Sequence, residues 1–346
     1  MEEYFLEKIQ NFTILPRRFG LKGGKIHLFG CAKSGKTSIA LDFAQKFKNP
    51  IYIDCNDPRI NVDNAKSTLL KYYLEKKIDI LIVDNFFANF TLPKLENIIL
   101  ISRSKNICLP NDFLSKQIYP LSFEEYISFD RRNLSINTLF NHFLKDGNLP
   151  EMQYLSEYQK ISRKQEINSL VFGNNVDLFK NIISYQSRKI TINQLYMQIK
   201  KQLRISKDKI YSFIDEIQSN GMIYLLSHMD DFKKPKKIYF YDFSISYAFC
   251  ADKSFQAIFE NMVFLELLSR YKAIHYTDNY DFITEENHVF ACIPFPDQRI
   301  IEEKIRKSQV KHSKTTIITI NYDIEGKTND INWRAVSFMN FALEDS

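Results

Sequence analysis

The residues with the clearest chemical potential lie in one short stretch, Gly30 to Thr37, with the sequence GCAKSGKT. The spacing G-x-x-x-x-G-K-T is typical of a phosphate-binding loop, or P-loop, when a strand precedes it and a helix follows. Backbone N–H groups of such a loop point inward, and the helix presents the positive end of its dipole to an anion. The stretch therefore predicts a binding site for nucleotide phosphates.

Each residue type in this loop has its own expected task. Gly30 and Gly35 allow the turn and a close approach of the backbone, and Lys36 would reach the β- and γ-phosphates. Thr37 would hold Mg²⁺ through its hydroxyl. The other loop residues expected at the nucleotide are Lys33, Ser34 and Ser38. A chance match is the alternative, but the apolar stretch before the loop and the helical spacing after it disfavour that interpretation.

Further candidate catalytic residues follow apolar runs. Residues 78–83 form a nearly continuous run that ends at Asp84, which is typical of a strand buried on both faces of a parallel sheet. Asp84 would complete the Mg²⁺ site. Asn85 could orient a water but cannot accept its proton. Ser102, after the next apolar run, would sense the γ-phosphate, with Ser104 as the alternative.

Composition limits the class of protein. The chain has 346 residues, 45% hydrophobic and 25% charged, which is an ordinary globular balance for two or three domains. Its five cysteines are scattered without a C-x-x-C pair, which disfavours disulfides and zinc and favours a reducing compartment. Because the chain begins Met-Glu-Glu and has no apolar run of about 18 residues, we expect a cytoplasmic protein without a membrane partner.

Strands and helices alternate through residues 1–150, after an amphipathic helix expected over residues 4–20. Strands are expected at 51–55, 78–84 and 98–102, with polar helical segments between them. This order predicts an α/β domain with a doubly wound parallel sheet in three layers, the P-loop NTPase arrangement. The catalytic residues fall at the carboxyl ends of the strands, where ligands bind in such sheets.

Residues 151–237 form a second region, of helices followed by a hairpin. A helix from about 190 to 199, a second from 206 to 218 and a strand at 222–226 give the order of a winged helix. Eleven basic residues against five acidic ones lie between Gln186 and Lys237, an excess as large as the net charge of +6 of the whole chain.

These basic residues predict contact with duplex DNA, because a helix-turn-helix reads DNA with its second helix and needs cations for the phosphates. The alternative is a winged helix used for packing or for contact with a protein partner. The residues expected at the nucleic acid are Lys200, Lys201, Arg204, Lys207, Lys209, Lys233, Lys234, Lys236 and Lys237.

Several longer blocks occur in a specific order: the P-loop, IDCNDPR, LIVDN, YPLSFEEYISF and FLKDGNLPE. In this order the chain resembles a large prokaryotic family of AAA-like ATPases, related to the archaeal-type ATPases, over nearly its whole length. The resemblance implies an ATP-binding domain with Mg²⁺, a winged helix, and an α+β C-terminal domain with a nuclease-like fold.

The resemblance also allows the C-terminal region, residues 238–346, to be compared with a PD-(D/E)xK nuclease core. Such a core holds its metal with a helix Glu, a strand Asp and a Glu-x-Lys on the next strand. Glu260 and Asp281 occupy the first two places, but Phe290-Ala291-Cys292 stands at the third. We therefore expect an inactive nuclease-like domain, and an ATP-dependent nuclease is disfavoured.

Two departures from the family concern ATP turnover. The family usually has an acid where this chain has Asn85, and its Gly-Arg pair before Tyr119 is missing, so no arginine that stabilises the transition state is identifiable. We therefore expect an ATP-dependent switch, an ATPase with slow or conditional hydrolysis. The alternative is a protein-interaction module that binds ATP without turning it over.

Overall fold

The computed structural model describes residues 17–18, 20–308 and 314–344. The amphipathic helix expected over residues 4–20 therefore falls almost wholly outside the described residues. No helix in these ranges is long and apolar enough to cross a membrane.

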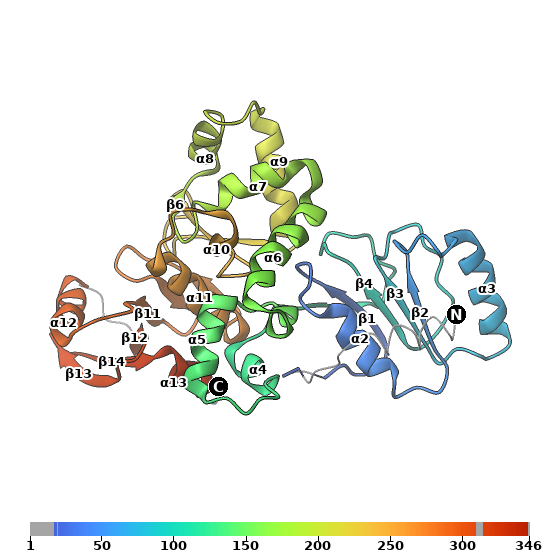
Figure 1. Cartoon of the computed structure of the whole chain (residues 1–346), viewed down its shortest axis with the longest axis horizontal. Helices are drawn as coiled ribbons and strands as arrows, with labels where there is room; N and C mark the ends of the chain where they lie inside the picture. Colours follow the sequence, from blue (N-terminus) through green and yellow to red (C-terminus); the bar gives the residue numbers. More distant parts are fainter. Residues whose placement is uncertain (1–16, 19, 309–313, 345–346) are drawn as a thin grey trace. The chain divides into compact units, whose positions relative to one another are not determined.

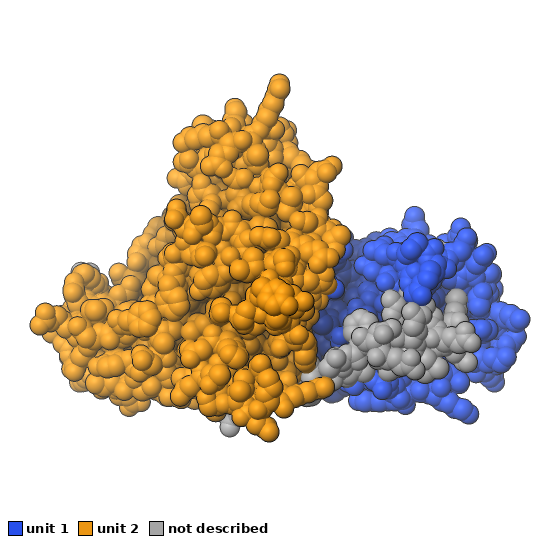
Figure 2. Space-filling view, in the orientation of Figure 1, with its two compact units in different colours: residues 1–120, 219–222 blue, residues 121–218, 223–346 orange. Residues whose placement is uncertain are grey.

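Contacts along the chain divide it into two compact units (Figure 2). Unit 1 comprises residues 1–120 and 219–222, and unit 2 comprises residues 121–218 and 223–346. The sequence predicts a first boundary near residue 150, about thirty residues later than the one that the contacts give.

Unit 1 is built on a five-stranded sheet in which every neighbouring pair is parallel, in the order β2-β3-β4-β1-β5 (Figure 1). Its strands are β1 (Lys25–Phe29), β2 (Pro50–Asp54), β3 (Ile80–Asp84), β4 (Ile98–Ile101) and β5 (Leu114–Gln117). The expectation of a parallel sheet is confirmed. The sequence did not indicate β5, because its four residues, LSKQ, are polar or exposed and lack an apolar run.

Helices cover both faces of this sheet. Helix α2 (Lys36–Ala44) packs on the face formed by Ile80 and Ile82 of β3. Helix α3 (Val62–Leu74) packs on the opposite face, formed by Leu81 and Val83 of the same strand. Because successive strand residues point to opposite faces, a fully apolar strand can support both layers. Unit 1 therefore has the three layers expected.

Unit 2 begins with helices and contains a small antiparallel sheet in the order β6-β8-β7. Helix–turn–helix–hairpin, the order expected from the sequence, is present in α8, α9, β7 and β8. The helices are α4 (Phe123–Ser128), α5 (Ile136–Asp146), η1 (Pro150–Tyr154), α6 (Glu157–Phe172), η2 (Gly173–Asn175), α7 (Val176–Ile183), α8 (Ile192–Ile199) and α9 (Lys207–Ser219). The strands are β6 (Lys189–Ile190), β7 (Ile223–Leu226) and β8 (Lys236–Phe240).

The rest of unit 2 is a six-stranded mixed sheet in the order β13-β14-β12-β11-β10-β9, with helices beside it. Helix α12 packs through Ile301 and Ile305 onto Val289, Ala291 and neighbouring side chains of the sheet. The strands are β9 (Ile274–His275), β10 (Phe282–Thr284), β11 (His288–Cys292), β12 (Lys314–Thr319), β13 (Ile324–Thr328) and β14 (Ile331–Ser337). The helices are α10 (Ser246–Phe249), α11 (Phe255–Arg270), α12 (Gln298–Lys307) and α13 (Phe338–Leu343).

An aromatic cluster explains why α4 and α5 belong to unit 2 rather than to the P-loop unit. Phe123 of α4 lies 5.2 Å from Phe143 of α5, between ring centroids. Phe143 lies 4.9 Å from Phe243, and Phe140 stacks on Phe338 at 5.7 Å. Buried aromatic pairs of this kind stabilise a fold beyond the area they bury. The sequence blocks around residues 119–129 and 143–151 therefore serve the core of unit 2.

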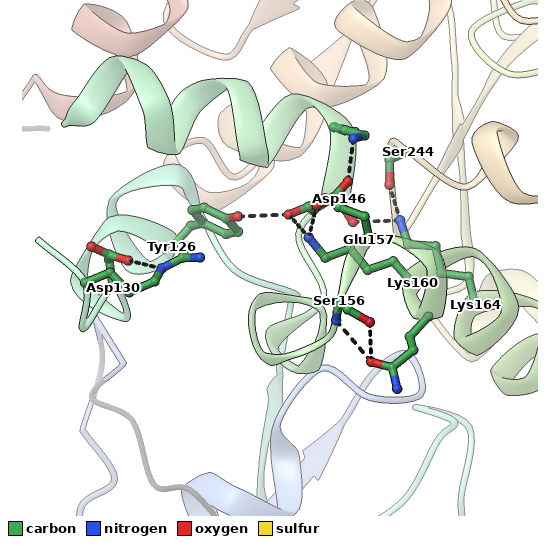
Figure 3. A network of polar contacts seen from close by, with 11 residues as sticks. Tyr126, Asp130, Asp146, Ser156, Glu157, Lys160, Lys164 and Ser244 are labelled. Atoms are coloured by element: carbon green, nitrogen blue, oxygen red, sulfur yellow. Dashed lines mark hydrogen bonds and ion pairs between the residues drawn. The ribbon is translucent and has the colours of Figure 1, made fainter. Parts of the chain in front are cut away.

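A buried polar network adjoins this cluster (Figure 3). The ammonium of Lys164, 3% exposed, donates to the Asp146 carbonyl at 2.7 Å and lies 2.9 Å from the Asp242 carboxylate. It also donates to the Ser244 hydroxyl. Lys160 pairs with the Asp146 carboxylate at 2.5 Å. A buried charge is tolerated only with partners of this kind, so these contacts fix the approach of α5, α6 and the segment after β8.

Gly147 ends α5, and the polar network leaves no room there for any residue other than glycine. Its φ is +80°, and an added Cβ would lie 2.2 Å from the Asp242 carboxylate and 2.2 Å from the Ser244 hydroxyl. We expect Gly147→Ala to lower the free energy of unfolding of unit 2 by about 3 kcal/mol or more, from backbone strain and the disrupted network. Chemical denaturation measures it.

Gly173→Ala is the matched control. Gly173 has φ +49°, but nothing lies within 4 Å of an added Cβ, so only backbone strain of about 1–2 kcal/mol is expected. Equal losses in the two variants would contradict the steric role of Gly147.

Candidate functional site

The P-loop between β1 and α2 has the backbone that its glycines allow. Gly30 has φ +137° and Gly35 φ +94°, and Lys33 is also left-handed at +63°. A Cβ on Gly30 would lie 2.4 Å from the carbonyl oxygen of Ile118. The loop is therefore a tight cradle that side chains at the two glycines would disrupt.

The first turn of α2 is open to an anion. Helix α2 begins after Gly35 without a side-chain cap and without an acidic residue in its first turn, so its first N–H groups are not satisfied by a cap. The Ser34 hydroxyl is turned to the Cys31 carbonyl at 3.0 Å. Ser38 is half-buried in the first turn, and Lys33 is exposed.

Arg17 supports the loop from outside, a role that the sequence did not indicate. Its guanidinium donates to the carbonyls of Ser34 and Tyr119, each at 2.9 Å. The two carbonyls belong to loops that follow β1 and β5, so this one side chain ties adjacent strand ends together. An arginine before the first strand offers no sequence signal for such a contact.

The charge of Lys36 is held inside the loop. Its side chain is 8% exposed, and the ammonium donates to the carbonyls of Gly30 at 2.9 Å and Cys31 at 2.6 Å. Burial lowers the pKa of Lys36, and the nearby Asp84 carboxylate opposes that shift. The ammonium therefore lies over the loop, beside the open end of α2.

Asp84 is the carboxylate that faces α2. Its Oδ2 accepts a hydrogen bond from the Thr37 hydroxyl at 2.6 Å and from the Tyr52 hydroxyl at 3.0 Å. Burial raises the pKa of Asp84. The hydrogen bond from Thr37 lowers this pKa, whereas the Asp54 carboxylate raises it further. A hydroxyl and a carboxylate in contact are an oxygen pair that suits Mg²⁺. The two residues predicted at the metal are thus adjacent.

Asn85 joins two acids instead of pointing freely into the site. Its backbone N–H donates to Oδ1 of Asp84 and its side-chain amide to Oδ1 of Asp54, both at 2.8 Å. The sequence pattern assigned no task to Asp54. The register of the sheet brings it to the site, because β2 and β3 are parallel and Asp54 is the partner of Asp84.

Ser102 directly follows β4, the strand that separates the P-loop strand β1 from β3. Its hydroxyl donates to the Ser104 carbonyl at 2.7 Å and lies 2.8 Å from Nε2 of His27. Nδ1 of His27 is 3.1 Å from the Ser115 hydroxyl of β5. Ser102 is therefore at the strand end where a sensor is expected, with its proton directed to a backbone carbonyl.

These residues fit a nucleotide phosphate with Mg²⁺. The loop leaves backbone N–H groups at the start of α2, Lys36 supplies a cation, and Thr37 with Asp84 supplies oxygen ligands. Arrangement and residue types both agree with phosphate binding.

The basic residues of unit 2 divide by exposure. Lys200, Lys201, Arg204, Lys207, Lys209 and Lys233 are exposed. Lys234 and Lys236 are half-buried, and Lys234 is paired with Asp278 at 2.7 Å. The exposed residues lie at the end of α8, in the turn and first turn of α9, and before β8.

Lys237 corrects the prediction for one of these lysines. It is 4% exposed, and its ammonium lies 2.9 Å from Glu260 and 3.0 Å from Asp281. Burial by itself would lower the pKa of Lys237. The Asp281 and Glu260 carboxylates outweigh that effect, so the pKa is raised. It therefore cannot contact a DNA phosphate. The sequence places it beside surface lysines, but in β8 its side chain points into the core.

The two acids expected for a nuclease core, Glu260 and Asp281, are thus brought together, with Lys237 between them. Burial foremost, and the nearby Asp281 carboxylate, raise the pKa of Glu260 to about 7. Cys292, at the third position, is buried, and its backbone N–H donates to the Asp281 carboxylate at 2.9 Å. No group of three or more His, Cys, Asp or Glu suited to a metal ion occurs among the described residues.

Comparisons with known proteins give distant structural similarity. No protein-family model matches the chain, and no curated protein matches it. One similar solved structure is the Orc1 protein of Aeropyrum pernix in complex with DNA, at 12% identity and a TM-score of 0.32, covering 72% of this chain and 92% of that one.

Two further solved structures are similar at the same level. A signal transduction ATPase with numerous domains from Pyrococcus horikoshii has 13% identity and a TM-score of 0.29, over 79% of this chain and 46% of that one. AMPPCP-bound DnaA from Aquifex aeolicus has 12% identity and a TM-score of 0.28, over 63% and 92%. Similarity this weak carries no conclusion about what this chain binds.

The sheet and the loop define the class of unit 1 by themselves. A parallel five-stranded sheet, helices on both faces and the G-x-x-x-x-G-K-T loop between β1 and α2 fit a P-loop NTPase fold.

His27 gives the stability of unit 1 a defined pH dependence. Burial lowers the pKa of His27 to about 4, from an ordinary value near 6.5. Because folding favours the neutral ring, this contribution is complete above pH 6.5 and is lost as the pH falls from 6.5 toward 4.

We therefore expect unit 1 to lose about 2 kcal/mol of unfolding free energy through this residue between pH 7.5 and pH 5. Denaturant unfolding of wild type and His27→Gln at both pH values measures it. The variant should lose less on acidification by that amount, and equal losses would contradict the assignment.

Proposed function

We propose that this chain is an ATP-binding, AAA-like protein that acts as an ATP-dependent switch, with slow or conditional hydrolysis and contact with duplex DNA. The observation that carries the nucleotide part is the Thr37–Asp84 hydrogen bond beside the open end of α2. It joins Thr37, in the first turn of α2, to a strand-end acid 47 residues away in sequence, in the arrangement that Mg²⁺ and phosphate oxygens require.

In this proposal each residue of the site has a definite task. Backbone N–H groups between Cys31 and Ser38 bind phosphate oxygens, Gly30 allows the turn of the loop, and the exposed Lys33 lies at its rim. Lys36 moves its ammonium from the loop carbonyls to the β- and γ-phosphates. Thr37 and Asp84 hold Mg²⁺, which neutralises phosphate charge when it is bound. Ser102 is near the γ-phosphate as a sensor.

Slow turnover follows from what surrounds these groups. Asn85 cannot take a proton, and its side-chain amide is already bonded to Asp54. The same observation favours the second candidate, an ATP-binding protein-interaction module without turnover. Measurement of ATP hydrolysis with and without DNA separates the two.

The DNA part of the proposal rests on exposed cations in a winged-helix-like arrangement. Helices α8 and α9 with strands β7 and β8 present six exposed basic residues, at the turn, the start of α9 and the hairpin. Cations at the start of the second helix are suited to phosphates beside a groove. Protein contact through the same elements is the alternative.

The C-terminal part of unit 2 is proposed to be nuclease-like in fold and inactive. Lys237 forms ion pairs with both acids that would bind the metal. A metal would have to displace this buried ammonium, which disfavours an ATP-dependent nuclease.

Lys36→Ala tests the nucleotide site. Loss of the ammonium should weaken binding of Mg·ATP by about 100-fold, since hydrogen bonds to charged groups contribute roughly 1.5–3 kcal/mol each. Calorimetric titration with ATP in the presence of Mg²⁺ measures the affinity. Lys46→Ala removes an exposed lysine just after α2 and is the control. Unchanged affinity in Lys36→Ala would exclude the P-loop as the nucleotide site.

Salt dependence tests the DNA contact. If six cations meet phosphates, the logarithm of affinity should fall against the logarithm of salt concentration with a slope of roughly −5. Replacing four of them with Gln should flatten the slope by about 3 to 4, as fluorescence anisotropy with a labelled duplex would show. The four lysines are Lys200, Lys201, Lys207 and Lys209.

The control for this variant removes the same charge elsewhere in unit 2. Its four exposed lysines are Lys253, Lys272, Lys307 and Lys327. If both sets change the slope equally, the attraction is general and the winged-helix surface is not the DNA site. Absence of binding at about 50 mM salt would remove the DNA contact altogether.

A further inference from the structure

The sequence pattern offers no residue that could take the proton from the attacking water, and the structure assigns this task to Asp54. We propose that Asp54, the last residue of β2, is the general base for the water that attacks ATP, in place of the acid that is missing at position 85. This inference rests on the proposed nucleotide site and adds the residue that would turn ATP over.

The sheet places Asp54 beside the expected metal ligand. Asp54 and Asp84 are register partners at the carboxyl ends of the neighbouring parallel strands β2 and β3. The carboxyl ends of the strands form the edge of the sheet at which ligands bind. Two carboxylates therefore reach the same edge, although the sequence pattern assigns a task only to Asp84.

Their hydrogen bonds give the two acids different tasks. Asp84 is 7% exposed, and its oxygens accept from Thr37, Tyr52 and the N–H of Asn85. Asp54 is only half-buried. Its Oδ1 accepts from the Asn85 amide at 2.8 Å and from the Asn56 N–H at 3.0 Å. Oδ2 has no partner within the ranges that the structure describes, so a water can reach it.

Asn85 holds this difference in place. Its φ of +52° is a left-handed conformation that asparagine tolerates better than most residues. In that conformation its backbone N–H and its side-chain amide bind one acid each. Asn85 is therefore a positioning residue, and an acid in its place would confront Asp54 with a like charge.

Other groups near the site are less suited to take a proton. Asp57 is engaged by the Arg59 guanidinium at 2.8 Å on the exposed loop after β2. Burial, and then the Asp54 and Asp84 carboxylates, raise the pKa of the Cys55 thiol to about 11. The Ser102 hydroxyl donates to the Ser104 carbonyl.

The proposed step balances without a further reactant. The water oxygen forms a bond to the γ-phosphorus while the bond from that phosphorus to the β-phosphate bridging oxygen breaks. The water proton passes to Oδ2 of Asp54 and then to solvent. The products are ADP and inorganic phosphate.

Asp54→Asn is the decisive variant, because the amide oxygen can still accept both hydrogen bonds. We expect hydrolysis to fall by about 100-fold, within the range of general-base effects, while the affinity for Mg·ATP changes by less than about threefold. Asp84→Asn should instead reduce the gain in ATP affinity that Mg²⁺ provides, as titrations with Mg²⁺ and with a chelator measure.

Two further variants separate Asp54 from its neighbours. Asn85→Asp should lower hydrolysis by at least about 10-fold through repulsion of Asp54, whereas a faster variant would place the base at position 85. Asp57→Asn changes an acid in the loop that follows β2 and is the matched control. This variant should hydrolyse ATP at the wild-type rate.

Several results would overturn the assignment. They are wild-type hydrolysis in Asp54→Asn, loss of Mg·ATP binding in that variant, a defect in Asp57→Asn as large as in Asp54→Asn, or a wild-type protein that binds Mg·ATP without turnover. Failure of the wild type to bind ATP would be a different result, since it would remove the proposed function itself.

Discussion

A charge that leaves water must keep a partner, and this constraint organises both units of the protein. In unit 1, Lys36 is buried inside its own loop and is held by two backbone carbonyls. Asp84, equally buried, is bonded by Thr37 and Tyr52. The ordering of the loop, the start of α2 and the end of β3 is therefore a consequence of satisfying one cation and one anion. The same groups are those that phosphate and Mg²⁺ would use.

Unit 2 contains two further buried charges that are held by partners. Lys164 ties α6 to the end of α5 and to Asp242, and the close fit at Gly147 leaves no room for a side chain. Lys237 joins Glu260 of α11 to Asp281 before β10. Removing one partner of such a pair leaves an unpaired buried charge, which is strongly destabilising. These buried lysines are thus part of the core and not part of a charged surface.

The same logic separates binding from turnover at the proposed nucleotide site. Asp84 is engaged on both oxygens and suits a fixed metal ligand, whereas Asp54 retains an oxygen toward solvent. A carboxylate that exchanges protons with water has to remain accessible to it. Under the proposed function, one acid would hold the metal and its neighbour on the next strand would take the proton.

The sequence by itself determined the elements whose cause is local. The glycine spacing of the P-loop, the apolar run of β3 and the helical periodicity of α9 depend on neighbouring residues, and all three are present. The tertiary structure alone decided which distant residues meet. Strand register brought Asp54 to Asp84 and β8 turned Lys237 into the core, while the polar β5 joined the sheet by pairing with β1. Side-chain charge and spacing cannot reveal such contacts. The contacts form only when strands far apart in sequence pair in one register and bury the side chains on their shared face.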